Sequence, residues 1–245
     1  MYREARPMIH IVTVVNNYGL FESTIKQNAF MNAFPIHVYD NTRENIGLSK
    51  RYNEFLEQAL PDDGWVVFCH QDFSLQEDLA PKLARVDPAC LYGPTGTGPV
   101  KQLLFIASIS RYGIERCRLG IYDRTKKFGR ITQKTPLKEQ RMGRYIRKPV
   151  VVDTVDCCCL IAHSSVIRKY GLRFDEKLDW HLYVEDFCLN ARERHGVLTK
   201  ALQLDCVHLS AGTTDTRFES DLVYLKAKYK TGYFSTTCYD GYRRF

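Results

Sequence analysis

Short apolar runs rich in β-branched residues alternate with amphipathic segments in the first part of the chain, and this alternation restricts the fold more than any other feature. Residues 8–16 (MIHIVTVVN) have the length of one strand, 20–33 show helical spacing, and 35–40 (PIHVYD) form a second strand. Another amphipathic segment covers 47–60, and 65–69 (WVVFC) is a third buried strand. Parallel strands need a crossover between them, so the order strand, helix, strand predicts parallel pairing. We therefore expect an α/β fold with a mixed, mostly parallel sheet flanked by helices.

Elements of the same two kinds continue through the rest of the chain. Strands are predicted at 89–92, 103–110, 150–162 and 197–207, and helices at 164–171, 183–195 and 217–230. With 44% hydrophobic and 26% charged residues, a chain of 245 residues can bury a core without disulfides. We expect one compact domain over 1–245, divided into a first half (1–110), a basic loop (111–149) and a second half (150–245).

The apolar runs and the cysteines predict the compartment. The first apolar run, 8–15, is far shorter than the roughly 20 residues that a membrane span needs, so neither a signal peptide nor a transmembrane helix is expected. The nine cysteines are scattered and odd in number, which favours buried free thiols in a reducing compartment. Neighbouring side chains of a strand point to opposite faces, so the triplet 157–159 is predicted to be structural and not a metal site. A cytoplasmic location, or one at the inner face of a membrane, follows as an expectation.

Positive charge is concentrated in one stretch. Residues 111–148 contain thirteen Lys or Arg and three acidic residues, which gives +10, so the rest of the chain carries −3 of the net +7. Four glycines interrupt this stretch, where the apolar periodicity fails, and predict a long loop or hairpin. Such a patch can meet nucleic acid, anionic lipid or a phosphate-bearing substrate. We expect a lid or an acceptor-docking loop, with peripheral membrane contact as a further option.

Polar residues follow several of the predicted strands, and in open α/β sheets ligands bind at these carboxyl ends. Asp72 follows a very apolar strand, where a carboxylate can hold a hard cation that bridges two phosphates, or can simply cap the next turn. His208 ends another strand. A neutral imidazole there could complete a metal shell begun by Asp72, or could be ordinary polar surface.

Two adjacent acids, Glu185 and Asp186, begin an amphipathic helix whose dipole favours their ionised forms. An ionised carboxylate aimed at a hydroxyl is what a general base requires. Acids at a helix start also occur for stability alone, so the residues by themselves leave both roles open.

In their order and spacing, these features resemble family 2 glycosyltransferases of the GT-A fold, and most of all the compact subgroup typified by a streptomycin-biosynthesis glycosyltransferase-like protein. The resemblance extends from about residue 8 to 212. It implies a GT-A (Rossmann-like) fold in which 1–110 binds a nucleotide sugar and 150–245 is the acceptor and catalytic half. The implied reaction moves a sugar from a nucleotide-diphosphate sugar to an acceptor hydroxyl, with inversion and with Mn²⁺ or Mg²⁺. The implied acceptor is a glycan, a lipid-linked molecule or a small molecule, and no nucleic acid is expected.

The resemblance also implies roles for particular residues. The donor-binding residues would be Thr13, Asn16, Asp40, Asn45, Gly47, Asn53, His70 and Asp72. The acidic pair would be catalytic, with Asp186 as the base beside Glu185, and the metal ligands would be Asp72 and His208. Asp156 and Trp180 would lie near the acceptor. The family's Asp-x-Asp metal motif corresponds to His70-Gln71-Asp72, so a histidine replaces its first acid.

Two other classes of protein are weighed against a transferase. A sugar nucleotidyltransferase would need a glycine-rich phosphate loop with a basic residue after its first strand, and 16–19 (NNYG) is a poor one. A non-catalytic protein could bind a nucleotide sugar, or could bind nucleic acid through the basic stretch. That stretch contains aromatic residues suited to stacking, but the chain has no recognised nucleic-acid motif.

Overall fold

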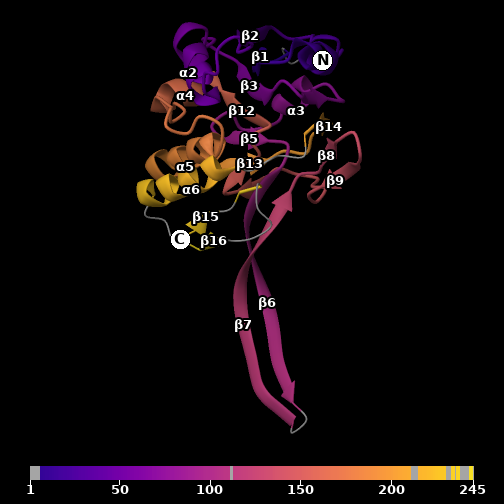
Figure 1. The fold of residues 1–245 in the computed structure, drawn as a ribbon, viewed down its shortest axis with the longest axis vertical. Coiled ribbons are helices and arrows are strands. Elements are labelled where there is room, and N and C mark those ends of the chain that lie inside the picture. The colour runs from indigo at the N-terminus through magenta and orange to yellow at the C-terminus, as the bar shows by residue number, and fades with distance from the viewer. Residues whose placement is uncertain are drawn as a thin grey trace.

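A seven-stranded sheet forms the centre of the molecule (Figure 1), in a computed structural model that describes residues 6–110, 113–210, 215–229, 233–234, 236–237 and 243–244. Its first three strands pair in parallel, as predicted. β1 (Ile9–Val15) lies between β2 (Ile36–Asp40) and β3 (Trp65–His70). The sheet order is β10-β13-β5-β12-β3-β1-β2, where β5 is Leu91–Gly93, β10 is Val150–Val152, β12 is Cys159–His163 and β13 is Thr199–Ala201. Only β12 and β10 run against the other strands, so this sheet is mostly parallel.

Both faces of the sheet are buried, because alternate residues of the central strands enter different core clusters. Val12 and Val14 of β1 belong to one cluster, and Ile11 and Val15 belong to the other. The first cluster is covered by α2 (Leu48–Gln58), α4 (Ser164–Tyr170), α5 (Tyr183–His195) and α6 (Thr216–Lys228). The second is covered by α1 (Tyr18–Phe21), the π-helix η1 (Glu22–Lys26), α3 (Ala80–Leu83) and a smaller sheet.

Two helix ends follow the sequence prediction, and one predicted helix does not form as expected. Gly171 (φ 58°) and Gly196 (φ 70°) adopt the left-handed conformation that ends α4 and α5. The prediction of one helix over 20–33 is wrong, because the helical turns stop at Lys26. Asn28 then accepts hydrogen bonds from the backbone N–H groups of Phe30 and Met31 through its side chain, which holds the chain in a turn instead.

The smaller sheet contains β4 (Phe73–Leu75), β8 (Ile131–Lys134), β9 (Glu139–Met142) and β14 (Cys206–His208) in the order β4-β14-β8-β9. The prediction of a single strand over 197–207 is wrong, since this segment forms β13 in the large sheet and β14 in the small one. The chain leaves the large sheet after Ala201, because β14 instead pairs antiparallel with β4. This exchange carries His208 to the end of β3.

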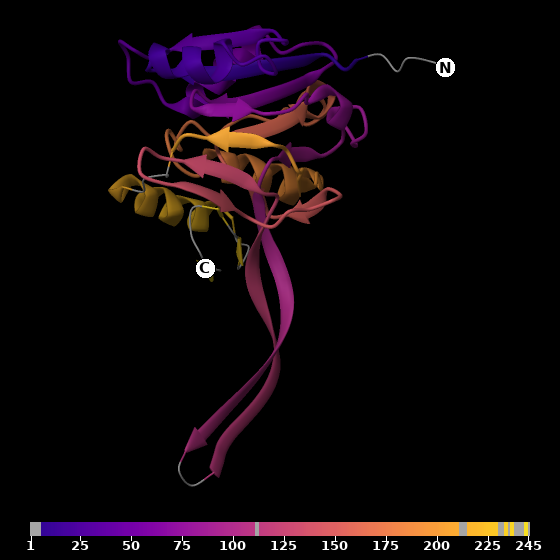
Figure 2. The same ribbon diagram turned by 90° about the vertical axis from the view of Figure 1, so that its right-hand side faces the viewer.

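A long antiparallel hairpin projects from the body, as Figures 1 and 2 show. It consists of β6 (Gly96–Ser110) and β7 (Gly113–Phe128), and the structure describes only the backbone of 99–125. The stretch predicted as a basic loop or hairpin, 111–149, therefore consists largely of strands. At its base β6 pairs with β11 (Thr154–Val155).

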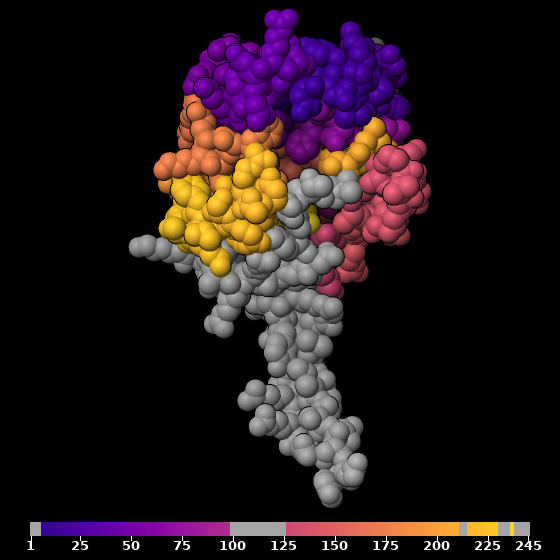
Figure 3. All heavy atoms as spheres, in the orientation of Figure 1, coloured from indigo at the N-terminus to yellow at the C-terminus, as the bar shows by residue number. Residues whose placement is uncertain are grey.

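On the face shown in Figure 3, β8 and β9 lie on the opposite side of the body from α6.

Near the C-terminus β15 (Tyr233–Phe234) pairs antiparallel with β16 (Arg243–Arg244). Among the described residues, none of the helices has both the length and the apolar character needed to cross a membrane.

Candidate active site

A cavity of about 150 Å³ opens at the carboxyl ends of β1 and β3, where ligands of open α/β sheets bind. It is lined by Val14, Asn16, Asn41, Leu48, His70, Gln71, Asp72 and Trp180. Three of the predicted donor-binding residues, Asn16, His70 and Asp72, thus lie at one cavity. Trp180, predicted near the acceptor, lies at the same cavity.

Two amide side chains that the sequence prediction did not assign help to build the cavity. Gln71 accepts hydrogen bonds from the backbone N–H groups of Asn16 (3.0 Å) and Asn17 (2.9 Å), and donates to the side-chain oxygen of Asn16. Asn41 donates to the backbone carbonyl of Ile46 (2.7 Å). Gln71 therefore ties the end of β3 to the end of β1. Its place between His70 and Asp72 was the only feature of the sequence that could have pointed to Gln71. A neutral side chain within a motif of acidic metal ligands gives no chemical reason to predict a binding role.

The other predicted donor-binding residues lie outside the cavity lining. Thr13 is fully buried within the sheet, and Asn53 holds Phe174 through its side chain, donating to the carbonyl (2.9 Å) and accepting from the N–H (3.0 Å). At Gly47 an added Cβ would collide with the side chain of Asp179, so the glycine allows close packing at this point.

Asp40 and Asn45 are exposed, and the Asp40 carboxylate accepts from the backbone N–H and the hydroxyl of Thr42. The donor-binding role of all five residues outside the lining stays a prediction.

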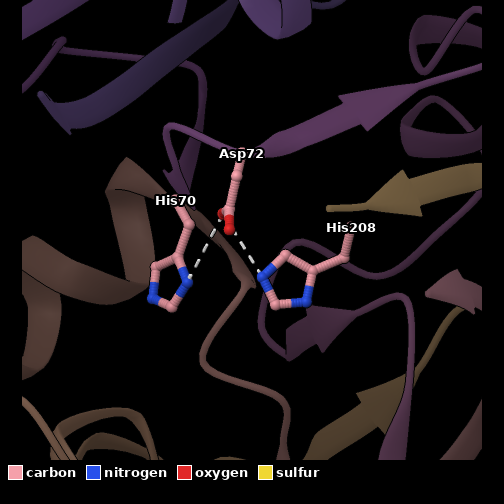
Figure 4. A group of neighbouring side chains, drawn as sticks. All are labelled: His70, Asp72 and His208. Carbon is pink, nitrogen blue, oxygen red and sulfur yellow. Dashed lines mark ion pairs between the residues drawn. The ribbon is translucent and has the colours of Figure 1, made fainter. Parts of the chain in front are cut away.

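Asp72 lies between two imidazoles (Figure 4). Its Oδ1 atom is 3.3 Å from His208 Nε2 and 3.9 Å from His70 Nδ1. His208 lies beside Asp72 because β14 pairs with β4 in the small sheet. One potential ligand atom from each of His70, Asp72 and His208 lies within 4.8 Å of the other two. The other ring nitrogen of His70, Nε2, forms a 2.8 Å hydrogen bond with the hydroxyl of Tyr183, which fixes the ring.

This cluster fits a divalent cation. Asp72 Oδ1 and both ring nitrogens of His208 are buried, and apart from the 3.3 Å contact between Asp72 and His208, the described part of the chain offers these atoms no hydrogen-bond partner. Buried polar atoms left in this way need an explanation, and a cation supplies one. A carboxylate with imidazoles suits a divalent transition-metal ion better than Mg²⁺, which prefers oxygen ligands alone.

The electrostatics of the cluster favour a charged carboxylate. Burial by itself would raise the pKa of Asp72, but the hydrogen bond and charge of His208 outweigh it and the pKa is lowered. Burial would likewise lower the pKa of His208, but Asp72 outweighs it and the pKa is raised. The pKa of His70 is lowered by burial and by the charge of His208. Asp72 and His208 therefore stabilise each other's charged forms, and a cation bound here would compete with the proton on His208.

The two adjacent acids of α5 make contact with different parts of the C-terminal region. Glu185 is fully buried and accepts a hydrogen bond from the hydroxyl of Thr236. Burial raises its pKa from the ordinary 4.5 to about 7. Asp186 is 1% exposed, and its Oδ1 atom is 2.7 Å from the Lys228 ammonium and 2.8 Å from the Tyr229 hydroxyl. Burial also raises the pKa of Asp186, against the opposing effect of Lys228.

Asp156 connects the cation cluster with the acidic pair. One oxygen accepts from the backbone N–H of Cys158 (3.0 Å), and the other accepts from the hydroxyl of Thr237 (2.6 Å). A carboxylate oxygen of Asp156, the Cys158 sulfur and a ring nitrogen of His208 lie within 4.8 Å of one another. The negative charge of Asp156 also contributes to the raised pKa of Glu185.

Six of the cysteines whose side chains the structure describes are buried free thiols, as predicted. They are Cys69, Cys90, Cys158, Cys159, Cys188 and Cys206. Although Cys158 lies near His208, burial and the charge of Asp156 raise its pKa, and a protonated thiol is a poor metal ligand.

Comparisons with known proteins bear on the fold. No protein-family model matches the sequence, and no curated protein matches it. The chain is similar to the solved structure of GalNAc-T7 with UDP, GalNAc and Mn²⁺, with a TM-score of 0.56 and 11% identity over 92% of this chain and 48% of that chain. It is also similar to S. aureus TarS 1–349, with a TM-score of 0.47 and 11% identity over 82% of this chain and 60% of that chain. The chain therefore spans less than two thirds of either protein's length in those structures. Together with the observed topology, the first likeness shows that the chain has a mixed α/β fold of the GT-A type, with a mostly parallel sheet flanked by helices.

Proposed function

We propose that this protein is a glycosyltransferase that binds a nucleotide-diphosphate sugar with a divalent cation and transfers the sugar to an acceptor hydroxyl with inversion. One observation supports this more than any other. In a GT-A fold, Asp72 and two histidines form a partly buried cluster beside a cavity at the carboxyl ends of the strands. Membership of family 2, the compact subgroup and a cytoplasmic location are finer parts of the same proposal.

The cavity walls suit a nucleotide. The amide side chains of Asn16, Asn41 and Gln71 offer donors and acceptors, and Trp180 offers an aromatic face. The solved GalNAc-T7 structure contains UDP, which makes a uridine nucleotide the first ligand to test.

Asp72 and His208 would hold the cation, and His70 lies close enough to join them. A cation bound there would neutralise negative charge on the leaving diphosphate. Mn²⁺ is the first ion to test, because the solved GalNAc-T7 structure contains it and Mg²⁺ prefers oxygen ligands alone.

Of the two acids, Glu185 has the pKa better suited to a base. Its pKa of about 7 matches the task of accepting a proton near neutral pH. In the reaction, the acceptor oxygen bonds to the anomeric carbon, its proton moves to Glu185, and the bond from that carbon to the diphosphate breaks. Asp186, the base predicted from the resemblance, is already paired with Lys228. Its catalytic role stays a prediction that a variant can test.

The test is binding of UDP and of UDP-sugars, measured by calorimetry and thermal shift with MnCl₂, MgCl₂ or EDTA. A ligand at 100 times its Kd should stabilise the fold by about 2.7 kcal/mol. In Asp72→Asn the Mn²⁺-dependent part of this stabilisation should disappear, because the cation loses the one carboxylate that the proposed cluster of described residues supplies. The matched control is Asp62→Asn, since Asp62 is fully exposed on a distant surface loop.

Equal Mn²⁺-dependent affinity in Asp72→Asn and in the wild type would remove Asp72 from the site. Binding of UDP without turnover of any UDP-sugar would instead favour the non-catalytic alternative.

A further inference from the structure

Two adjoining cavities open beside the small sheet, and Lys82, Tyr145 and Gln203 line both of them. The first cavity has a volume of about 320 Å³ and the second of about 220 Å³. The first is within the range of small-molecule pockets, which is about 300–1,000 Å³. None of the residues that line them also lines the cavity at the carboxyl ends of β1 and β3. A ligand bound here would therefore occupy a site separate from that of the nucleotide.

The second cavity is basic. Arg85, which follows α3, lines it together with Arg147 and Lys148, and no carboxylate among the described residues pairs with these three side chains. None of the described residues that line this cavity is acidic. Ile146 and Leu202, which are 8% and 6% exposed, line it too, and apolar walls strengthen the attraction between a charge and its counter-ion. Three cations in these surroundings attract an anion, and a phosphate group supplies both charge and acceptor oxygens.

The first cavity presents groups of both signs. Arg141 of β9 and Thr132 of β8 are opposite each other in the register of the two strands, so they lie on one face of the small sheet with Cβ atoms about 5 Å apart. Asp205, directly before β14, adds a carboxylate that has no hydrogen-bond or ion-pair partner among the described residues. Asp205 would repel a simple anion, whereas a sugar hydroxyl can donate to this carboxylate and accept from Arg141.

Tyr145 lies where the two cavities meet and is 58% exposed. The guanidinium carbon of Arg130 lies 5.3 Å from the centre of its ring, which steadies the ring by a cation–π contact. A ring of this kind offers an apolar face and a hydroxyl at its edge. Both features suit contact with a sugar, whose ring has apolar C–H groups as well as hydroxyls.

Gln203 fixes the walls of both cavities. Its side-chain oxygen accepts from the backbone N–H groups of Arg130 (3.1 Å) and Ile146 (3.3 Å), and its side-chain nitrogen donates to the carbonyl of Arg130 (3.0 Å). Lys82 donates to the carbonyl of Gln203 (2.6 Å) and pairs with Glu77 (2.7 Å). These bonds tie the segments before β8 and after β9 to the connection between β13 and β14. The cavities are therefore formed before any ligand arrives, which lowers the cost of binding.

We propose that the two cavities together bind a sugar phosphate, with the phosphate in the second cavity and the sugar ring beside Tyr145 in the first. The phosphate would accept from Arg147 and Lys148, and a ring hydroxyl would donate to Asp205. An inorganic anion would need only the basic cavity, and a neutral sugar only the other, so the pairing of the two defines the ligand class. The inference does not depend on the proposed transfer reaction, because the two sites share no residue.

The first experiment measures binding to the full-length protein by calorimetry. The probes are glucose 1-phosphate, glucose 6-phosphate, N-acetylglucosamine 1-phosphate and ribose 5-phosphate, compared with inorganic phosphate and with glucose. At least one sugar phosphate should bind about tenfold or more tightly than inorganic phosphate and than glucose, the factor expected for one hydrogen bond to a charged group. If no sugar phosphate binds more tightly than inorganic phosphate, the proposal is wrong.

The variant Arg147→Gln/Lys148→Gln should lose about tenfold or more of the affinity for that sugar phosphate, because the phosphate loses two charged donors. Both side chains are exposed, so the fold should be retained. The matched control is Lys134→Gln/Lys138→Gln, which removes the same charge from the same basic stretch but outside both cavities. Equal losses in the two variants would reduce the effect to general charge and overturn the proposal.

Asp205→Asn separates a sugar phosphate from a simple anion. The substitution keeps the shape of the side chain and removes its charge. Affinity for the sugar phosphate should fall by about tenfold, because a ring hydroxyl loses a charged acceptor. Affinity for inorganic phosphate should stay the same or rise, because repulsion decreases. Sugar-phosphate affinity that does not fall, or that falls together with phosphate affinity, would contradict the proposal.

Further titrations identify the source of the ligand. Vesicles of phosphatidylcholine with phosphatidylinositol should bind in addition if a lipid headgroup carries the sugar phosphate, whereas binding of the soluble esters alone assigns it to a free molecule. Single-stranded RNA that binds more tightly than every sugar phosphate would overturn the proposal in favour of nucleic acid. UDP with MnCl₂ should bind Arg147→Gln/Lys148→Gln with the wild-type Kd, and loss of that binding would assign these cations to the donor site instead.

Discussion

Glu185 is the residue for which the structure predicts the clearest pH dependence. Its folded-state pKa of about 7 lies above the ordinary 4.5, so the folded protein binds this proton more tightly than the unfolded chain does. Its contribution to stability is therefore fully present below about pH 4.5 and is lost as the pH rises to about 7. Glu185→Gln should remove this loss, and should make the protein more stable than the wild type by about 3 kcal/mol above pH 7. Urea unfolding as a function of pH measures the effect, and parallel pH profiles of the two proteins would contradict it.

The same substitution should reduce sugar transfer by about 10²- to 10⁴-fold, the usual contribution of a positioned base. In the wild type, transfer should increase with pH through about 7, since only ionised Glu185 can accept a proton. Donor affinity should not change, because Glu185 does not line the cavity. A Glu185→Gln variant with full kcat would show that another group is the base.

Asp186 provides the contrasting prediction. Its carboxylate is buried against Lys228, and removing one partner of a buried ion pair costs about 3 kcal/mol or more. We expect Asp186→Asn to lower the free energy of unfolding by about that amount while transfer is retained, and Asp186→Asn/Lys228→Met to recover part of the loss. Denaturant unfolding and UDP release measure the two quantities. Unchanged stability with lost transfer would establish Asp186 as the base, as the sequence resemblance implies.

The β6–β7 hairpin is the element that depends least on the body. β6 pairs with β11 only at Gly96 and Thr97, and from Val100 onward the described strand pairs are those within the hairpin. An isolated two-stranded hairpin adds little stability in water. Replacing 101–123 by an Asn-Gly turn should therefore change the free energy of unfolding by less than about 1 kcal/mol and leave UDP binding with Mn²⁺ intact. Calorimetry checks both, and loss of nucleotide binding would support the lid that the basic stretch was predicted to form.

At the scale of elements, local patterns predict well where one interaction dominates. The apolar runs at 9–15 and 65–70 were recognisable because a strand buried on both faces needs continuous apolar sequence. The helix ends at Gly171 and Gly196 could also be predicted from the sequence, since the left-handed conformation that ends a helix favours glycine. The division of the segment 197–207 could not be predicted from the sequence. β13 and β14 are both three-residue strands with the same burial pattern, and only their pairing partners assign them to different sheets.

Across the whole molecule, the sequence by itself determined the α/β class, the parallel start of the sheet and the chemistry available at the strand ends. Those properties follow from apolar periodicity and side-chain type, which are local. Only the tertiary structure decided which polar groups contact one another. His208 contacts Asp72 because β14 pairs with β4. The adjacent residues Glu185 and Asp186 have different partners because α5 directs their side chains toward different neighbours. These side-chain contacts join residues that are far apart in the chain. Burial then alters the pKa values of the same groups. No short segment of sequence determines either the contacts or the pKa shifts.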